Sequence, residues 1–110
     1  MPNVKIYVDE TLFPVCRAAL LEALRPLRTL LCDALNVDPL ACQFAILSAV
    51  VMPDLPQVNV EIHILPHADR TRERLTLLAK QVQAEIGAVT KVHTAVRMAV
   101  LVPEGYVALK

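Results

Sequence analysis

The polypeptide repeats one hydropathy pattern twice, and this repetition limits its possible folds more than any other feature. Residues 2–52 and 57–102 each start with an alternating segment, continue with an amphipathic segment and end with an apolar run. Alternating apolar side chains indicate a strand, and apolar spacings of three and four indicate a helix. The expected elements are strand 3–8, helix 15–35, strand 43–52, strand 57–65, helix 70–86 and strand 92–102. We therefore expect two β-α-β units, each with parallel strands.

Both expected helices contain residues that affect their shape or ends. Pro26 should bend or split the first helix just before that position, because its ring removes a backbone donor. Asp69 is a candidate N-cap for the second helix, and Gly87 is a candidate C-terminal cap. The second helix starts with a charged cluster of Arg70, Arg72, Glu73 and Arg74. We expect this cluster to be a solvated face, although cations at a helix N-terminus oppose the macrodipole.

Strands 43–52 and 92–102 are apolar on both sides, whereas two helices can cover only one face of a four-stranded sheet. Burying a Leu or Val side chain contributes about 1.5–3 kcal/mol, and soluble monomers rarely leave such a surface exposed. We expect a single α+β domain over residues 1–110, with two helices on one face of the sheet. The second face requires another layer, so we expect a homo-oligomer.

Composition excludes several classes of function. The 11 basic and 11 acidic residues cancel, which argues against a nucleic-acid partner. Two glycines cannot form a phosphate-binding loop, so we expect no nucleotide cofactor. The start of the chain does not resemble a secretory signal and no apolar run could cross a bilayer, so we expect a cytoplasmic location. The three cysteines contain no C-x-x-C pair, and we expect them to be reduced packing residues.

The element order and the proline after Met1 resemble the tautomerase (macrophage migration inhibitory factor-like) superfamily, and within it a small uncharacterised bacterial branch. The matching segments are Pro2 with strand 3–8, Val37-Asp38-Pro39-Leu40 before the second strand, and residues 58–64 before the second helix. The resemblance implies a tautomerase-like fold, a trimer around a central barrel, and Pro2 as catalytic base. The implied activity is cofactor-independent tautomerisation or isomerisation of small keto–enol acids.

Pro2 suits that chemistry if Met1 is removed. The free secondary amine would have an ordinary pKa of about 7.7–8.0, and an apolar pocket would lower it. A base with a pKa near neutrality can take a proton α to a carbonyl group and return it at another atom. Without this chemistry, Pro2 would merely start an edge strand.

The resemblance also implies cations near the proline, but this sequence has Phe44 and Val37 at the two expected positions. The substitutes that we consider for substrate binding are Lys5, His63, His93 and Arg97. Arg97 lies in an otherwise apolar strand, so it would either bind an anion or form an ion pair between subunits.

Other interpretations remain open. His63, His67 and His93 do not have the spacing of a zinc site, and we expect no bound metal. The element order is also that of ferredoxin-like domains, in which the chain would be a ligand-binding module and Pro2 incidental. A third alternative is a trimer with the tautomerase fold and no activity.

Overall fold

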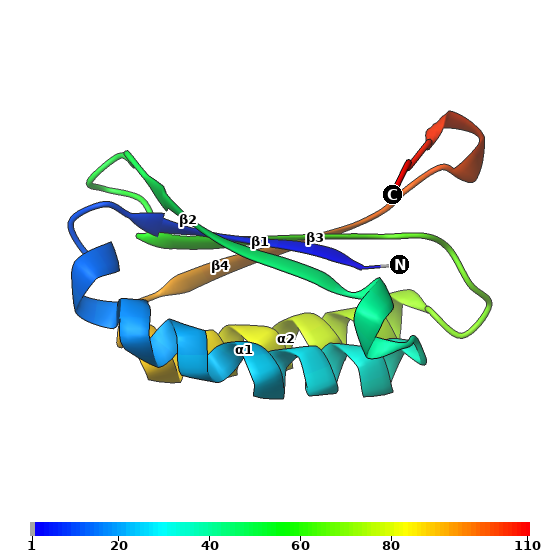
Figure 1. The fold of residues 1–110 in the computed structure, drawn as a ribbon, viewed down its shortest axis with the longest axis horizontal. Helices are drawn as coiled ribbons and strands as arrows, with labels where there is room; N and C mark the ends of the chain where they lie inside the picture. Colours follow the sequence, from blue (N-terminus) through cyan, green and yellow to red (C-terminus); the bar gives the residue numbers. More distant parts are fainter. Residues whose placement is uncertain (1) are drawn as a thin grey trace.

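The computed structural model describes residues 2–110 and shows one four-stranded sheet with both helices on one side (Figure 1). The elements, in chain order, are β1 (Asn3–Asp9), α1 (Phe13–Leu35), β2 (Gln43–Ala49), β3 (Val58–Ile64), α2 (Arg72–Thr90) and β4 (Thr94–Val100). Two short 3₁₀ turns, η1 (Pro39–Ala41) and η2 (Pro103–Gly105), precede β2 and follow β4. The α+β class and the duplicated β-α-β order expected from the sequence are confirmed.

The sheet has the strand order β2-β1-β3-β4. Each β-α-β unit contributes two neighbouring parallel strands, and the two units meet through the antiparallel pair of β1 and β3. In a split β-α-β arrangement of the ferredoxin type, another strand separates the two strands of a unit. The observed order therefore does not support the ferredoxin-like alternative.

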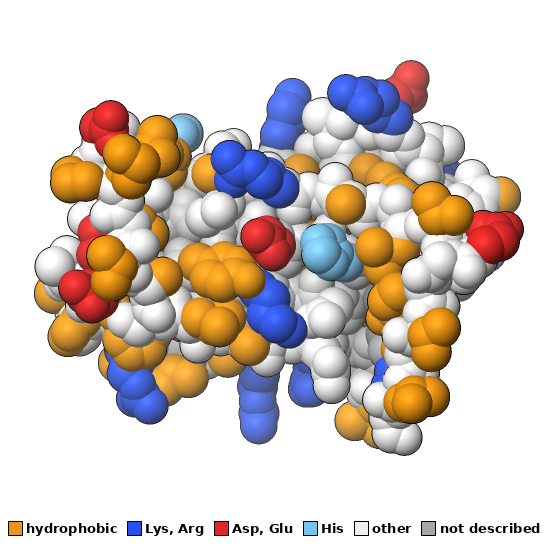
Figure 2. Space-filling model, turned by 90° about the horizontal axis from the view of Figure 1, so that it is seen from above, with side chains coloured by type: hydrophobic (Ala, Val, Ile, Leu, Met, Phe, Trp, Pro, Cys, Tyr) orange, Lys and Arg blue, Asp and Glu red, His pale blue; other side chains and the backbone are white. Residues whose placement is uncertain are grey.

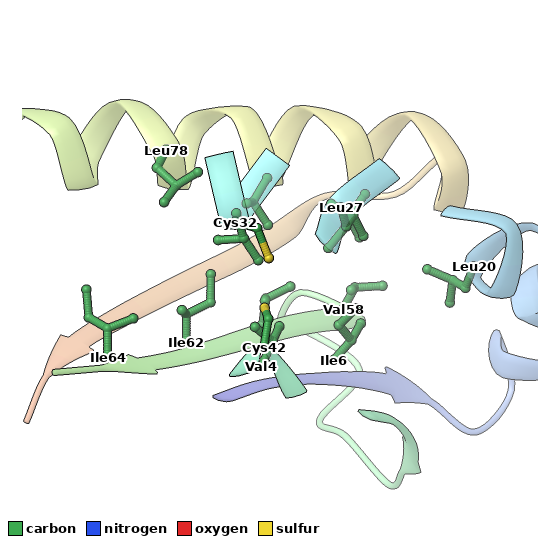
Figure 3. Close-up of a cluster of buried hydrophobic side chains, with 14 of the residues drawn as sticks. Val4, Ile6, Leu20, Leu27, Cys32, Cys42, Val58, Ile62, Ile64 and Leu78 are labelled. Carbon is green, nitrogen blue, oxygen red and sulfur yellow. The ribbon is translucent and has the colours of Figure 1, made fainter. Parts of the chain in front are cut away.

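The core lies between the sheet and the two helices (Figure 3). Alternate residues of the central strands point toward the helices and are fully buried, as the alternation along the sequence predicts. They pack against an aliphatic stripe on each helix, which comprises Leu20, Leu27 and Leu31 on α1 and Leu78, Val82 and Ile86 on α2.

The two edge strands are shorter than predicted. The strand expected over 43–52 ends at Ala49, and the strand expected over 92–102 runs from Thr94 to Val100. Each edge strand stops where its one neighbouring strand stops. Ala49 pairs with Asp9 at the end of β1, and Val100 pairs with Ile64 at the end of β3. Apolar composition extends beyond these points, but the partner strands end there, so the strand pairing ends as well.

Pro26 was expected to bend or split α1, and it does not split it. The helix runs without interruption from Phe13 to Leu35 with Pro26 inside it. Pro26 and Glu22, the residue whose carbonyl loses its helical partner, are both exposed, so water can satisfy that carbonyl.

The predicted caps of α2 were also wrong. Thr71, not Asp69, is the N-cap, and its side chain accepts a hydrogen bond from the backbone N–H of Arg74. The helix continues through Gly87 to Thr90, and Lys91 ends it in the left-handed conformation with φ 64°. Its N–H donates to the carbonyl of Gly87 at 2.8 Å. Within residues 2–110, no helix is long and apolar enough to cross a membrane.

Candidate functional site

Pro2 is buried at the start of β1, one of the two central strands. Its carbonyl oxygen accepts a hydrogen bond from the backbone N–H of Gln43 at 3.0 Å. Asn3 pairs with Gln43 on one side and with His63 on the other, so Pro2 comes level with Cys42 and Ile64. Both of these neighbours are buried hydrophobic residues. The predicted removal of Met1 concerns a residue outside the described range.

Several chain segments meet at the end of the sheet where Pro2 lies (Figure 1). The C-terminal end of α1, η1 and the connection from β3 to α2 all lie there. Arg70, in that connection, joins two of these segments through its guanidinium group. Nη2 donates to the carbonyl of Leu35 at 3.2 Å, and Nη1 donates to the carbonyl of Leu65 at 2.5 Å.

The Arg70 contacts explain one member of the charged cluster that the sequence left without a clear role. Leu35 is the last residue of α1, which has no basic residue in its own last turn. A cation at that end stabilises the helix dipole and the terminal carbonyls. Arg70 supplies this cation from another element. Its Nε is buried and has no hydrogen-bond partner among the described residues.

Two pockets border Arg70. One, of about 250 Å³, lies between the helices and includes Leu35 and Arg74 in its wall. The other, of about 480 Å³, lies between α2 and β4 and is lined by Arg70, Arg72, Leu75, Thr76, Ala79, Met98 and Val100. Val100 pairs with Ile64, so the second pocket opens at the same end of the sheet as Pro2.

Three of the four cations proposed from the sequence lie on the open face of the sheet. Lys5, Glu61 and Arg97 occupy one row of the register, and His63 lies in the next row toward Pro2. Figure 2 shows charged and histidine side chains together near the middle of this face, with apolar side chains around them.

The hydrogen bonds of these cations stay within the open face. Lys5 Nζ donates to Asn3 Oδ1 at 2.6 Å, and Arg97 Nη1 donates to Asn59 Oδ1 at 2.6 Å. Among the described residues, neither cation forms an ion pair with Glu61. The acceptors of both cations are neutral side chains.

His93 lies far from Pro2 along the sheet. It precedes β4 and borders a pocket of about 360 Å³ with the 53–57 loop at the opposite end. His67 is on the connection from β3 to α2, where its Nδ1 lies 3.5 Å from Asp69 Oδ2. Within residues 2–110, no three His, Cys, Asp or Glu side chains are grouped so that they could hold a metal ion.

The positions where the resemblance implied cations hold packing residues. Phe44 and Val37 are partly buried and pack against the core. Positive charge at this end of the sheet comes from Arg25 and Arg28 of α1, which line a pocket with Cys42, and from residues 70–74 at the start of α2, which the sequence interpretation treated as a solvated face.

No family model and no curated protein matches this sequence. Solved structures do match over nearly the whole chain. A member of the cis-3-chloroacrylic acid dehalogenase family has a TM-score of 0.69 at 19% identity, covering 96% of this chain and 79% of that one. Macrophage migration inhibitory factor from Toxoplasma gondii has a TM-score of 0.67 at 14% identity, covering 96% and 95%.

A fused 4-OT, a symmetric trimer, has a TM-score of 0.64 at 12% identity, covering 90% of this chain and 85% of that one. These likenesses cover both β-α-β units and the connections between them. The chain therefore has the tautomerase-like fold of macrophage migration inhibitory factor, as its resemblance to that superfamily predicted.

Proposed function

We propose that this chain is a cofactor-independent tautomerase or isomerase of small keto–enol acids, with the Pro2 amine as general base once Met1 is removed. The observation that carries the proposal is the buried position of Pro2 at the start of a central strand in this fold. Apolar neighbours disfavour the charged form of an amine, which lowers its pKa from the ordinary 7.7–8.0. The ring also fixes the direction of the nitrogen lone pair.

The proposed substrate carries a carboxylate beside its enolisable carbon, because the cations at this end of the sheet suit an anion. One structural neighbour belongs to a family named for an unsaturated acid, cis-3-chloroacrylic acid. Arg72 is the cation that we assign to the carboxylate. It is exposed, and it borders the pocket at Met98 and Val100.

The sheet geometry supports this assignment. β4 is two strands from β1, about 10 Å at ordinary strand spacing, a span that an arginine side chain and a small acid can cover together. Lys5, His63 and Arg97 are less suited because they lie on the open face, and His93 is at the far end. Arg70 is already held by two carbonyl groups.

The proposed reaction moves one proton. The Pro2 nitrogen takes it from the carbon α to the substrate carbonyl, and charge develops on the carbonyl oxygen. The protonated amine then returns the proton at a different atom, which completes the isomerisation. Arg72 would hold the substrate so that this carbon faces the amine.

The proposed assembly is a homotrimer. One structural neighbour is a symmetric trimer, and this chain exposes apolar side chains around the charged centre of its open sheet face (Figure 2) and along its C-terminal segment. Packing of the open faces around an axis would bury the edge strands and place Arg97 near another subunit. Light scattering should give the mass of three chains, whereas a single-chain mass would contradict this assembly.

The test of activity compares wild type with Pro2→Ala and Arg72→Ala on phenylpyruvate-type enols. Intact mass first establishes whether Met1 is absent. Loss of general base catalysis should lower kcat by about 10²–10⁴-fold in Pro2→Ala. Arg72→Ala should mainly raise KM, and Arg17→Ala on the exposed side of α1 is the matched control. Equal activity of wild type and Pro2→Ala would refute the proposal.

A second candidate function is that of an inactive protein that keeps the fold and its assembly. The apolar side chains of Phe44 and Val37 favour it, because they pack in the core where the resemblance implies cations. In that case the enol conversion rate with wild type would equal the buffer rate, although light scattering would still give a trimer.

A further inference from the structure

Two of the three cysteines meet in the core. Cys32 lies in the last part of α1, and Cys42 directly precedes β2. Their side chains point toward each other in Figure 3, and the Cys32 thiol is one cause of the raised pKa of Cys42. Both residues are buried, at 5% and 7% exposure. Cys16 is on the same helix as Cys32 but about 24 Å away along its axis, at 1.5 Å rise per residue.

One side of the pair is close to solvent. Cys42 forms part of the wall of a pocket of about 340 Å³, together with Leu24, Arg25, Arg28 and Phe44. A peroxide-sized molecule fits in that volume and would lie against Cys42. Cys16 lines none of the pockets described here.

We propose that Cys32 and Cys42 are a redox pair, which a peroxide converts into an intramolecular disulfide between α1 and the start of β2. Two S–H bonds and the O–O bond of hydrogen peroxide break, and one S–S bond forms. The two sulfur atoms lose two electrons in total, the two oxygen atoms gain them, and the hydrogens leave as two water molecules. The bond needs a specific geometry, and the two side chains already face each other.

The surroundings of the pair make its oxidation slow. The pKa of Cys42 is raised to about 12, mainly by burial and next by the neighbouring Cys32. The thiolate is the reactive form, so the reaction is slow at neutral pH. The linkage would close the short segment of residues 33–41, whose end leads into Gln43 and its hydrogen bond to Pro2.

The test uses the whole chain, first reduced and then freed of reductant. It is incubated with hydrogen peroxide, denatured, alkylated with iodoacetamide and weighed intact. Oxidised wild type should lose two hydrogen masses and take up one label, at Cys16, where reduced wild type takes up three. Cleavage before aspartate separates Cys32 from Cys42, because Asp33 and Asp38 lie between them. The two peptides should therefore stay joined until they are reduced.

Two variants control the test. Cys16→Ala should still lose two hydrogen masses and take up no label after oxidation. Cys32→Ala should lose none and should keep Cys42 open to alkylation. If Cys32→Ala fails to fold, the peptide map of Cys16→Ala still decides the question, because cleavage before aspartate leaves Cys16 and Cys32 on one peptide and this variant removes Cys16 from it. The proposal is wrong if oxidised wild type takes up all three labels, if disulfides form only between chains, or if Cys42 is over-oxidised without a link to Cys32.

Discussion

Replacing Arg70 should destabilise the domain more than replacing any other arginine near it. Its two guanidinium contacts join the last carbonyl of α1 to the end of β3, and the group is partly buried. Hydrogen bonds that involve a charged group contribute about 1.5–3 kcal/mol each. Water can reach part of this region, so we use the lower value. Arg70→Met should then lower the free energy of unfolding by about 3 kcal/mol.

Thermal and urea unfolding followed by circular dichroism measure this change at one fixed protein concentration, since self-association would add to the apparent stability. At about 4 °C per kcal/mol, Tm should fall by about 12 °C. Arg70→Lys should lose about half as much, because an ammonium group on one stem cannot reach both carbonyls. Arg72→Met is the matched control because Arg72 is exposed. If the free energies of unfolding of Arg70→Met and Arg72→Met differ by less than about 1 kcal/mol, the proposed stabilisation by the two Arg70 hydrogen bonds is wrong.

Two further predictions concern single positions. Lys91→Gly should raise the free energy of unfolding by about 0.5–1 kcal/mol in urea titrations, because Lys91 has φ 64° and glycine adopts that conformation without a steric cost. Lys91→Ala should not raise the free energy of unfolding. If alanine stabilised the protein as much as glycine, this reason would be wrong. The pKa of the Asp9 carboxyl lies below 3.8, mainly because it accepts a hydrogen bond from the Thr11 backbone N–H. Its ionised form therefore adds stability above pH 3.8 that is lost as the pH falls through the lowered pKa. Unfolding measured from pH 6 down to pH 2 should show wild type losing its advantage over Asp9→Asn, and parallel curves for the two proteins would disprove this.

The sequence predicts the central part of the fold well because its signals there are local. Strands 3–8 and 57–65 alternate in hydropathy, and the structure buries their apolar positions as the alternation requires. The ends of the edge strands depend on partners that are distant in sequence. Ala49 ends β2 only because Asp9 ends β1, and no local signal in residues 50–52 indicates this.

The candidate site was only partly predictable for the same reason. Pro2 could be proposed from the sequence because its place after Met1 is visible there and fits a known pattern. The role of Arg70 was missed because its acceptors, Leu35 and Leu65, come together only in three dimensions. One signal was available, namely a cation at the start of a helix, where the macrodipole disfavours it. Such a cation is a reason to look for a second element that uses it.

The pairing of Cys32 with Cys42 was also missed, because only the distance from Cys16 to Cys32 along one helix could be worked out from the sequence. Cys42 reaches Cys32 after the chain turns through Asn36, in the left-handed conformation with φ 54°, and through η1. That turn returns the chain to the sheet under the end of α1. Its geometry depends on backbone conformations that the sequence segment 36–42 does not specify.

The central claim is that Pro2 provides an amine whose pKa is below that of an ordinary chain terminus. Labelling proline with ¹⁵N and following the Pro2 nitrogen by NMR from pH 4 to pH 10 measures that pKa directly. We expect the Pro2 resonance to titrate below the ordinary range of about 7.7–8.0. A Pro2 nitrogen that does not titrate, because Met1 is still attached, or one that titrates within the ordinary range, would contradict the account.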